Sequence, residues 1–432
     1  MSAEAVLPVT RAGTSSVRRT LVLFAVATLP FTYALTVNLS FPLKIYEVVL
    51  SLVLMSHLLD LRLPLAPGAM TPARRLAWFA SAAAVLTLVR FAIPAEGSSV
   101  GDFGVRFGPI GDAVAKLLYL ALGVLSFLLF TRAAYEDEGR FLRAWRIGAT
   151  MAAAYSWYLF VAGLLGFEPF LLPGIADPKY FTVAGRSFVR SGVFNEGNIL
   201  GLFMLLSVGL ALYERRRLVA VLFSLTLLLT FSTVSVIGLA LLWIMVWYRE
   251  HSNLSVGRRA LYLSLGAVAM LAVGFALWQA GYLQAVILGK LGGDEFSSRV
   301  KRIAFAIAGL RMFADHPLLG VGLSQFGYFY NSYQTLGIFG VTGTVKVIPN
   351  SIYIELLSEL GIAGFLLFAS FLLLVYRRLR LPELTPLRLT FITMLFAWNA
   401  FPTYTMMFLW AFLGLAVGAS SRLTRSRPTT AT

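Results

Sequence analysis

Two arginines in this chain each stand at the same distance before a glycine. Ten residues separate Arg190 from Gly201, and ten separate Arg311 from Gly322. Each arginine falls in a polar stretch that lies between long apolar runs. A guanidinium remains protonated and presents a fork of donors that matches a phosphate or carboxylate group. We therefore expect two cationic surfaces, each suited to an anionic ligand.

The stretch 281–361 is the longest interval without a membrane-length apolar run, and it holds the densest set of ionisable residues. These residues are Asp294, Glu295, Arg299, Lys301, Arg302, Arg311, Asp315, His316 and Lys346. A second polar loop, which contains several prolines, covers 167–193 and includes Arg186 and Arg190. We expect these two loops to be the working surfaces of the protein.

Composition places both loops on a membrane protein. Hydrophobic residues make up 58% of the chain and charged residues only 13%, against roughly 25% charged residues in soluble domains. The formal charge of +16 would suggest nucleic acid binding in a soluble chain. Here most Lys and Arg lie in short segments between apolar runs, so membrane topology explains most of the excess. The chain has no Cys and three His, which excludes a disulfide framework and gives poor material for a zinc centre.

The elements that must position the two loops are apolar runs close to the ~20 residues that a membrane-spanning helix needs. We predict an all-α polytopic membrane protein with about twelve transmembrane helices and two sizeable outer loops, the larger of them partly helical. The predicted spans are 21–37, 43–61, 76–93, 113–130, 147–165, 194–213, two within 218–248, 260–280, 352–376 and two within 389–420. The chain then divides into N-terminal helices with the smaller loop (1–279), the large outer catalytic loop (280–351), and C-terminal helices with a cytoplasmic tail (352–432).

The distribution of Lys and Arg sets the orientation of these helices. Twenty-three of the 36 Lys and Arg fall on one side, which the positive-inside rule identifies as cytoplasmic. The two long loops then face outwards, and both termini lie in the cytoplasm. All six Lys fall on the outer side by this count. A cationic cluster on the outside runs against the usual bias, so it calls for a functional explanation.

Two pieces of sequence form a longer signature in and after the large loop. The first runs from Arg302 to His316-Pro317, fourteen residues later, and on through Leu318-Leu319-Gly320-Val321-Gly322 to Phe326. The second is Tyr353-Ile354-Glu355-Leu356-Leu357-Ser358-Glu359-Leu360-Gly361. Both pieces, together with the span pattern, resemble the O-antigen ligase and polymerase superfamily, membrane glycosyltransferases that use undecaprenyl-diphosphate-linked glycans. The paired Arg and Gly elements are similar to those of Wzy-type polymerases.

The chain departs from the ligase pattern at one place. Ligases of this superfamily carry a His, followed by Asn, just before the Tyr-x-Glu element, and that His is regarded as central to catalysis. Here Pro349-Asn350-Ser351-Ile352 precedes Tyr353, with Asn350 or a neighbour in the place of the His. The resemblance therefore implies a polymerase of O-antigen or exopolysaccharide repeat units. An O-antigen ligase is the alternative, and a lipid-linked glycan transporter or flippase is an alternative of another class.

The resemblance also implies roles for individual residues. Transfer from a polyprenyl diphosphate expels a diphosphate, whose negative charge must be stabilised by fixed cations or by a metal. Because the outer loops hold no Asp-x-Asp-like cluster, we expect arginines to do this, with no metal and no other cofactor. The candidate catalytic residues are Arg302, Arg311, Glu355 and Asn350. The candidate substrate-binding residues are Arg190, Arg186, Arg299, Tyr353, His316, Gly201 and Gly322.

Some of these residues have a second interpretation. His316, before Pro317, serves either as a turn residue or as a proton acceptor. Glu355 stands one turn into a membrane helix, where an ionisable group is functional by default, and polar packing is its alternative role. The aromatic residues that follow Gly322 either anchor the membrane interface or stack on sugar rings.

The resemblance implies partners and a location as well. The expected partners are an undecaprenyl-diphosphate-linked oligosaccharide, an acceptor glycolipid and the lipid bilayer, with a chain-length regulator protein as a further candidate and no nucleic acid. The expected location is the bacterial inner membrane, with the active site in the periplasm.

Overall fold

Helices form at every predicted span. The computed structural model describes residues 11–38, 42–60, 65–93, 108–175, 178–183, 186–194, 196–279, 293–334, 347–401 and 403–426. The helices at the predicted spans are α1 (Arg11–Thr28), α2 (Ile45–Leu59), α3 (Met70–Ala92), α4 (Gly108–Glu136), α5 (Glu138–Leu165), α6 (Gly197–Tyr213), α7 (Arg217–Leu228), α8 (Thr233–Glu250), α9 (Val256–Gln279), α13 (Ile352–Arg378), α14 (Thr385–Ala397) and α15 (Met407–Ser426). The mostly helical fold and the membrane class are as predicted.

Some of these helices are long and apolar enough to span a bilayer. Within the described ranges these are α3, α4, α5, α8, α13 and α15, while α2, α6 and α7 are apolar but shorter. The count of twelve crossings therefore stays a prediction. The run 218–248 is divided as expected, because the Ser232 side chain accepts a hydrogen bond from the Ser235 backbone N–H and caps the start of α8.

The centre of the bundle is α15, whose residues from Met407 to Ser421 are all buried. It packs closely on α4 through small residues. A Cβ added at Gly414 would lie 2.7 Å from Phe130 Cβ, and one at Gly123 would lie 2.5 Å from Trp410 Nε1. Small residues let membrane helices approach closely enough for van der Waals packing, which replaces the hydrophobic driving force within lipid.

The smaller of the two polar loops contains a β-hairpin that was not predicted. Strands β3 (Tyr180–Val183) and β4 (Arg186–Val189) pair antiparallel, with Phe181 opposite Phe188. Both rings are buried and pack with Phe231, which lies between α7 and α8. A second short pair, β1 (Val37–Asn38) and β2 (Pro42–Leu43), follows α1.

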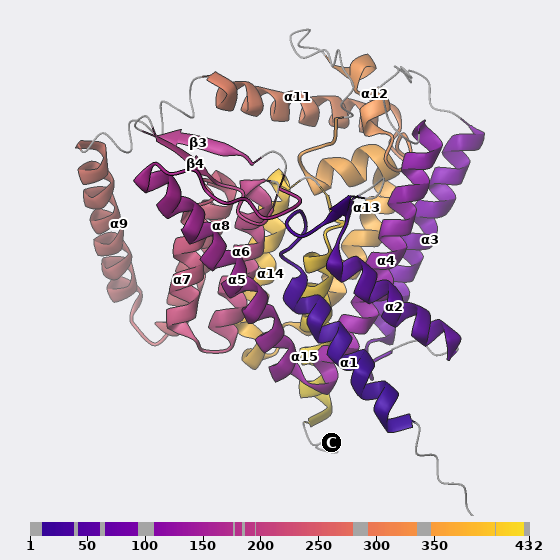
Figure 1. The fold of residues 1–432 in the computed structure, drawn as a ribbon, viewed down its shortest axis with the longest axis horizontal. Helices are drawn as coiled ribbons and strands as arrows, with labels where there is room; N and C mark the ends of the chain where they lie inside the picture. The colour runs from indigo at the N-terminus through magenta and orange to yellow at the C-terminus, as the bar shows by residue number, and fades with distance from the viewer. Residues whose placement is uncertain are drawn as a thin grey trace, which may run out of the picture.

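The larger of the two polar loops contains two helices. Helix α11 (Gly293–Asp315) lies across one end of the bundle, transverse to the long helices, and α12 (Phe326–Tyr333) lies beside it (Figure 1). Two single-turn 3₁₀ helices, η1 (Pro382–Leu384) and η2 (Trp398–Ala400), flank α14. Lys346 and the remainder of 335–346 lie outside the described residues.

Most aromatic residues of α12 belong to a small buried core. Phe326, Tyr328 and Tyr330 are buried against Ala308 and Met312 of α11. The Tyr328 hydroxyl donates to Asp112 Oδ2 at 2.9 Å. Burial, with this hydrogen bond and the Asp112 charge, raises the pKa of Tyr328. These contacts hold α11 and α12 together as one unit over the bundle.

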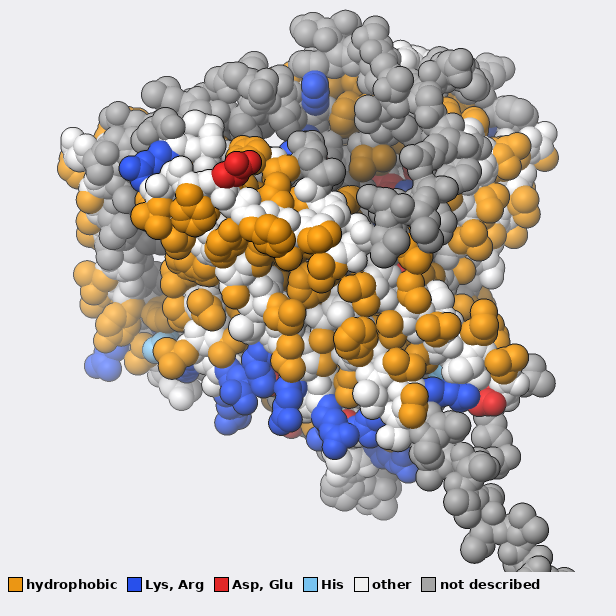
Figure 2. Space-filling view, in the orientation of Figure 1, with side chains coloured by type: hydrophobic (Ala, Val, Ile, Leu, Met, Phe, Trp, Pro, Cys, Tyr) orange, Lys and Arg blue, Asp and Glu red, His pale blue; other side chains and the backbone are white. Residues whose placement is uncertain are grey.

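Positive charge gathers at the opposite end of the molecule. In Figure 2, Lys and Arg side chains form a band along the lower edge, away from α11 and the β3–β4 hairpin. This band matches the arrangement that the positive-inside count predicts.

Candidate functional site

A kink in α13 forms the surface on which the loop between α11 and α12 packs. Gly361 has φ 63° and ψ −166°, far from helical values, in the middle of α13. The break alters the helical hydrogen-bond ladder, and the Ile362 backbone N–H donates to the Pro317 carbonyl at 2.8 Å. The Ser358 and Glu359 carbonyls accept from the backbone N–H groups of Val321 and Gly322, at 2.8 and 2.9 Å.

Glycine is required on both sides of this contact. A Cβ at Gly361 would lie 2.5 Å from the Leu318 carbonyl, and a Cβ at Gly320 would collide with the backbone of Glu359. Gly322 has φ 109°, which side-chain-bearing residues rarely adopt. The two signature pieces, 302–326 and 353–361, are therefore the two halves of a single backbone interface.

The Glu359 carboxylate fixes the start of α12. Its Oε2 accepts from the Ser324 backbone N–H at 2.8 Å, and its Oε1 lies 3.4 Å from the Phe326 backbone nitrogen. A carboxylate at this place satisfies donors that the first turn of a helix leaves free. Arg90 of α3 adds a hydrogen bond from Nε to the Gly320 carbonyl at 2.6 Å. The loop is thus held by α3 as well as by α13.

A small polar pocket lies where α11 crosses the beginning of α13. It has a volume of about 60 Å³, and its lining brings together Arg302, Asn350, Ser351 and Asn399, with Ile354 on the α13 side. This volume is well below the ~300–1,000 Å³ of typical small-molecule sites. A phosphoryl group is of about the size that this volume holds. Arg302 and Asn350, two of the predicted catalytic residues, are therefore neighbours in space.

Arg311 does not share this pocket. Arg302 and Gly309 are seven positions apart, which places them on the same face of α11, and Gly309 packs on Ile354 of α13. Arg311 is nine positions from Arg302, and nine steps of about 100° turn a side chain to the opposite face. Its side chain is exposed. Arg299 also lies in α11, but its side chain is outside the described part of the structure.

Consecutive residues of α13 face three different neighbours. Ile354 lines the Arg302 pocket, and the Tyr353 hydroxyl donates to the Leu395 carbonyl of α14 at 2.7 Å. Glu355 is 1% exposed and forms an ion pair with Lys116 of α4. The predicted residues Tyr353 and Glu355 are thus near the pocket in sequence, yet their side chains point away from it.

Lys116 joins two buried carboxylates. Its Nζ contacts Glu355 Oε1 and lies 3.4 Å from Glu359 Oε2, and its side chain is 16% exposed. Thr403 Oγ1 lies 3.4 Å from Glu355 Oε1. Among the described residues, Glu355 Oε2 is buried without a hydrogen-bond partner. Lys116, which the sequence count placed on the outer side, lies about two turns into α4 and faces the bundle.

His316 takes part in the turn that ends α11. Its backbone N–H donates to the Met312 carbonyl at 2.9 Å, and its carbonyl accepts from the Gly320 N–H at 2.9 Å. Its Nε2 lies 3.4 Å from the Tyr333 hydroxyl. These contacts agree with the turn-residue interpretation, and the role of His316 as a proton acceptor stays a prediction.

The first arginine element has a different structure from the second. Arg190 follows β4, and its backbone N–H donates to the Lys179 carbonyl at 2.9 Å. Gly201 is buried within α6, where a Cβ would collide with Ser235 of α8. Arg186 is exposed and donates from Nη1 to the Leu164 carbonyl at the end of α5. The equal spacing of the two elements therefore does not reflect a common local fold, and their roles in substrate binding stay predictions.

The comparison with known proteins bears on this same region. Residues 218–369 match the family model described as O-antigen ligase. This chain carries a domain of the O-antigen ligase and polymerase superfamily. The matched range contains α11, α12, both halves of the backbone interface, Arg302, Asn350 and Glu355. A search of curated proteins found no match.

The superfamily assignment confirms the resemblance that the two signature pieces predicted. It supports a function of the O-antigen ligase or polymerase type, and it does not separate these two activities. It also supports a transferase-like or ligase-like enzyme in a membrane. The Arg190 element, Lys116 and Asn399 lie outside the matched range.

Sequence reasoning missed residues that the structure places around the site. Lys116 gave a usable signal, because a single charge within an apolar span is functional or paired by default. Glu355 and Glu359 gave another, since residues four apart share a helix face. Asn399 gave none, because its position beside Arg302 depends on how α14 packs.

Metal ligands do not cluster in the described ranges. No group of three or more His, Cys, Asp or Glu side chains that could hold a metal ion is found there. Metal independence of the reaction stays a prediction.

Proposed function

We propose that this protein polymerises undecaprenyl-diphosphate-linked oligosaccharide repeat units into O-antigen or exopolysaccharide chains at the outer face of the cytoplasmic membrane. The observation that supports this proposal is the convergence of Arg302, Asn350 and Asn399 on one polar pocket at the N-terminal end of α13. The pocket lies at the end of the molecule opposite the band of arginines. It also lies within or next to the domain that matches the superfamily.

In this reaction an acceptor hydroxyl oxygen bonds to the anomeric carbon of the donor glycan. The bond from that carbon to the diphosphate oxygen breaks, and the oxygen keeps the electron pair. Arg302 serves as the counter-charge for that oxygen, because its fork can hold two phosphate oxygens at once. Asn350 and Asn399 supply neutral amide donors beside it. Fixed donors of this kind stabilise charge as it develops in the transition state.

The hydroxyl proton must pass to a base, and Glu355 is the proposed acceptor. It lies one turn along α13 from Ser351, which lines the pocket, and its Oε2 has no partner among the described residues. Lys116 and Thr403 contact the other oxygen and set the orientation of the carboxylate. Because Glu355 is buried, this role requires α13 and its neighbours to open toward the pocket when substrate binds.

A polymerase needs places for two lipid-linked substrates, and the proposal uses two cationic surfaces. The Arg302 pocket is assigned to the donor diphosphate. Arg186 and Arg190, at the β3–β4 hairpin, are assigned to the incoming unit, and Arg311 and Arg299 of α11 are placed as further contacts. The reaction is proposed to need no divalent metal, so that purified enzyme keeps its activity in a chelator. A chain-length regulator remains a candidate partner on sequence grounds alone.

A deletion strain tests the assignment in cells. Loss of a polymerase leaves single repeat units attached to the acceptor or accumulated on the lipid carrier, and a gel of the surface glycan shows the missing ladder. If the strain instead builds long lipid-linked chains that never reach an acceptor core, the protein is a ligase. The matching family is described as O-antigen ligase, which makes this the second candidate function.

A further inference from the structure

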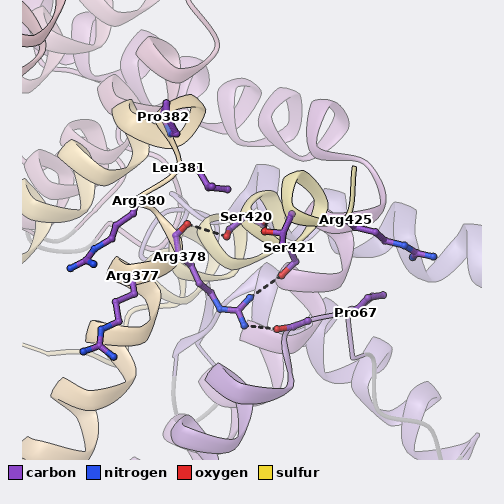
Figure 3. Close-up of a pocket in the computed structure, with 11 residues that line it drawn as sticks. Pro67, Arg377, Arg378, Arg380, Leu381, Pro382, Ser420, Ser421 and Arg425 are labelled. Carbon is purple, nitrogen blue, oxygen red and sulfur yellow. Dashed lines mark hydrogen bonds between the residues drawn. The ribbon is translucent and has the colours of Figure 1, made fainter. Parts of the chain in front are cut away.

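A basic pocket lies at the other end of α13 from the candidate site. It has a volume of about 600 Å³ and is formed where the ends of α13 and α15 meet η1 and the turn at Pro67-Gly68. Four arginines line it: Arg377, Arg378, Arg380 and Arg425. In Figure 3, Arg377 and Arg380 extend from the α13 side, Arg425 extends from the α15 side, and Arg378 points between them.

The charge of this pocket is not neutralised by the protein within the described residues. No carboxylate of that part of the chain lies within ion-pair distance of the four guanidinium groups. Other arginines at the same end of the molecule do have acidic partners. Arg18 pairs with Asp60 at 2.5 Å, and Arg217 pairs with Glu250 at 2.9 Å. Topology alone accounts for arginines at helix ends, but not for four of them around one hollow with no counter-ion among the described residues.

The arginines are instead held by neutral groups. Arg378 donates from Nη2 to the Gly68 carbonyl at 2.6 Å and from Nη1 to Ser421 Oγ at 3.2 Å (Figure 3). Arg425 donates to the Tyr135 hydroxyl at 2.7 Å. The Arg380 guanidinium lies 5.8 Å from the ring centroid of Tyr376. These contacts orient the guanidinium groups and leave their charge available to an external anion.

The position and lining of the pocket identify the class of anion. The pocket lies at the ends of two helices that are long and apolar enough to span a bilayer, so it is at the depth of lipid headgroups. Leu381, Pro382 and Pro67 add apolar surface beside the arginines. A volume of about 600 Å³ holds more than a lone phosphate. Basic pockets between membrane helices on the cytoplasmic side suit anionic lipid headgroups.

We propose that this pocket binds the phosphate-bearing headgroup of an anionic phospholipid, such as phosphatidylglycerol or cardiolipin, in the adjacent leaflet. Arginine forks hold the phosphate oxygens, and the apolar wall meets the glycerol and the first part of the acyl chains. Because Arg378 already joins α13 to α15 and to the Gly68 turn, the bound lipid strengthens the contact at the base of α13. This site is separate from the proposed transferase pocket.

The test uses the purified full-length protein in neutral detergent. Native mass spectrometry counts bound lipids, and melting temperature is measured with phosphatidylglycerol, cardiolipin, phosphatidylcholine or inorganic phosphate added. The pocket variant is Arg377→Gln with Arg380→Gln, because both side chains are exposed and neither makes a hydrogen bond between helices in the described residues. The matched control is Arg143→Gln with Arg258→Gln, two exposed arginines outside the pocket with the same loss of charge.

The proposal predicts that anionic lipid binds and raises the melting temperature of the wild type, while phosphatidylcholine and inorganic phosphate do not. The pocket variant should bind anionic lipid on the order of tenfold more weakly, and the control should bind like the wild type. Adding Arg378→Gln should abolish the remaining preference. Equal weakening in the pocket variant and the control would overturn the proposal in favour of non-specific attraction. An equal effect of inorganic phosphate would identify a soluble anion as the ligand instead.

Discussion

At the scale of single residues, the candidate site rests on one cation whose geometry matters as much as its charge. Arg302 is partly buried in a pocket with the amides of Asn350 and Asn399. A guanidinium can bind two oxygens of a phosphate in one plane, whereas an ammonium acts as a point charge. Arg302 and Lys301 are adjacent in sequence, yet Lys301 is exposed and does not line the pocket. Substitutions at Arg302 and at Lys301 can therefore separate the effect of position from the effect of charge.

Arg302→Lys should lower turnover by at least about tenfold, because a charge-assisted hydrogen bond worth roughly 1.5–3 kcal/mol is lost while the charge remains. Initial rates of chain elongation in proteoliposomes measure this effect. Lys301→Gln is the control and should keep near-normal rates, although it removes a full charge from the same helix. A normal rate for Arg302→Lys would show that the fork is not used.

The two interpretations of Glu355 make different predictions. If Glu355 accepts the proton, Glu355→Gln should lower turnover by roughly 10²–10⁴-fold with little change in melting temperature, because the amide keeps the shape of the side chain. Lys116→Met should instead lower stability by about 3–5 kcal/mol, since it leaves buried carboxylates without their cation.

Elongation rate and melting temperature, measured together, decide between these interpretations. The double variant, Lys116→Met with Glu355→Gln, should recover part of the stability that Lys116→Met loses. Only the Glu359 carboxylate then lacks its lysine partner, and it retains its backbone donors. Full activity in Glu355→Gln would leave Glu355 as a packing residue.

At the scale of elements, the loop 316–325 is fixed by backbone contacts with the kinked part of α13. Gly320 and Gly361 both have positive φ, and both have backbone atoms of the partner segment where a Cβ would stand. Gly266 of α9 has nothing within 4 Å of its Cβ position. Gly320 and Gly361 therefore permit the close backbone contact at the interface. Gly266 is a control glycine within the same protein.

Gly320→Ala and Gly361→Ala should each cost at least about 1–3 kcal/mol of local stability from backbone strain alone, with further loss from overlap. Hydrogen exchange at the amides of α12 should rise, and elongation should fall, because α12 and the end of α11 lose their support. Gly266→Ala should be neutral or slightly stabilising, since alanine favours helix. Unchanged exchange at α12 in both interface variants would show that the loop does not depend on this contact.

Elements set by local sequence were predictable, and contacts set by packing were not. The apolar runs predicted the positions of α3, α4 and α13, and Ser232 marked the division between α7 and α8. The β3–β4 hairpin was not predicted, because the charges and prolines of 167–193 indicate a loop. Tyr180–Val183 and Arg186–Val189 are nevertheless short segments rich in aromatic and β-branched residues, which favour strands.

The candidate site was likewise predictable where local sequence determines it, but not where helix packing does. Arg302 and Asn350 were named from the signature, but their proximity depends on the crossing of α11 over α13. The separation of Arg302 from Arg311 follows from helical periodicity and was open to prediction once 293–315 was taken as helix.

At the scale of the whole molecule, the proposed topology assigns a side of the membrane to each end. The arginine band in Figure 2 marks one end, and α11 with the hairpin marks the other. The absence of Cys from the sequence makes single-cysteine labelling straightforward. Ser332 of α12 and Ser252, between α8 and α9, are both exposed and lie at the two ends.

Ser332→Cys should react with an impermeant thiol reagent added to the outer side of intact cells, and Ser252→Cys should react only in inverted membrane vesicles. This labelling pattern is expected because the end with the excess of Lys and Arg should face the cytoplasm. Labelling of Ser252→Cys from the outside, with protection of Ser332→Cys, would reverse the topology and remove the proposed outer site.

Elongation by the purified protein alone is the most direct test of the proposed polymerase activity. Proteoliposomes that contain the full chain are supplied with a single undecaprenyl-diphosphate-linked repeat unit, and products are separated by length. A polymerase should produce a ladder of longer lipid-linked chains with the wild type, and should leave the unit unextended with Arg302→Ala or Arg190→Ala. If the unit is not lengthened but is transferred intact to an added lipid A-core acceptor, the protein is a ligase, and the assignment as a polymerase is wrong.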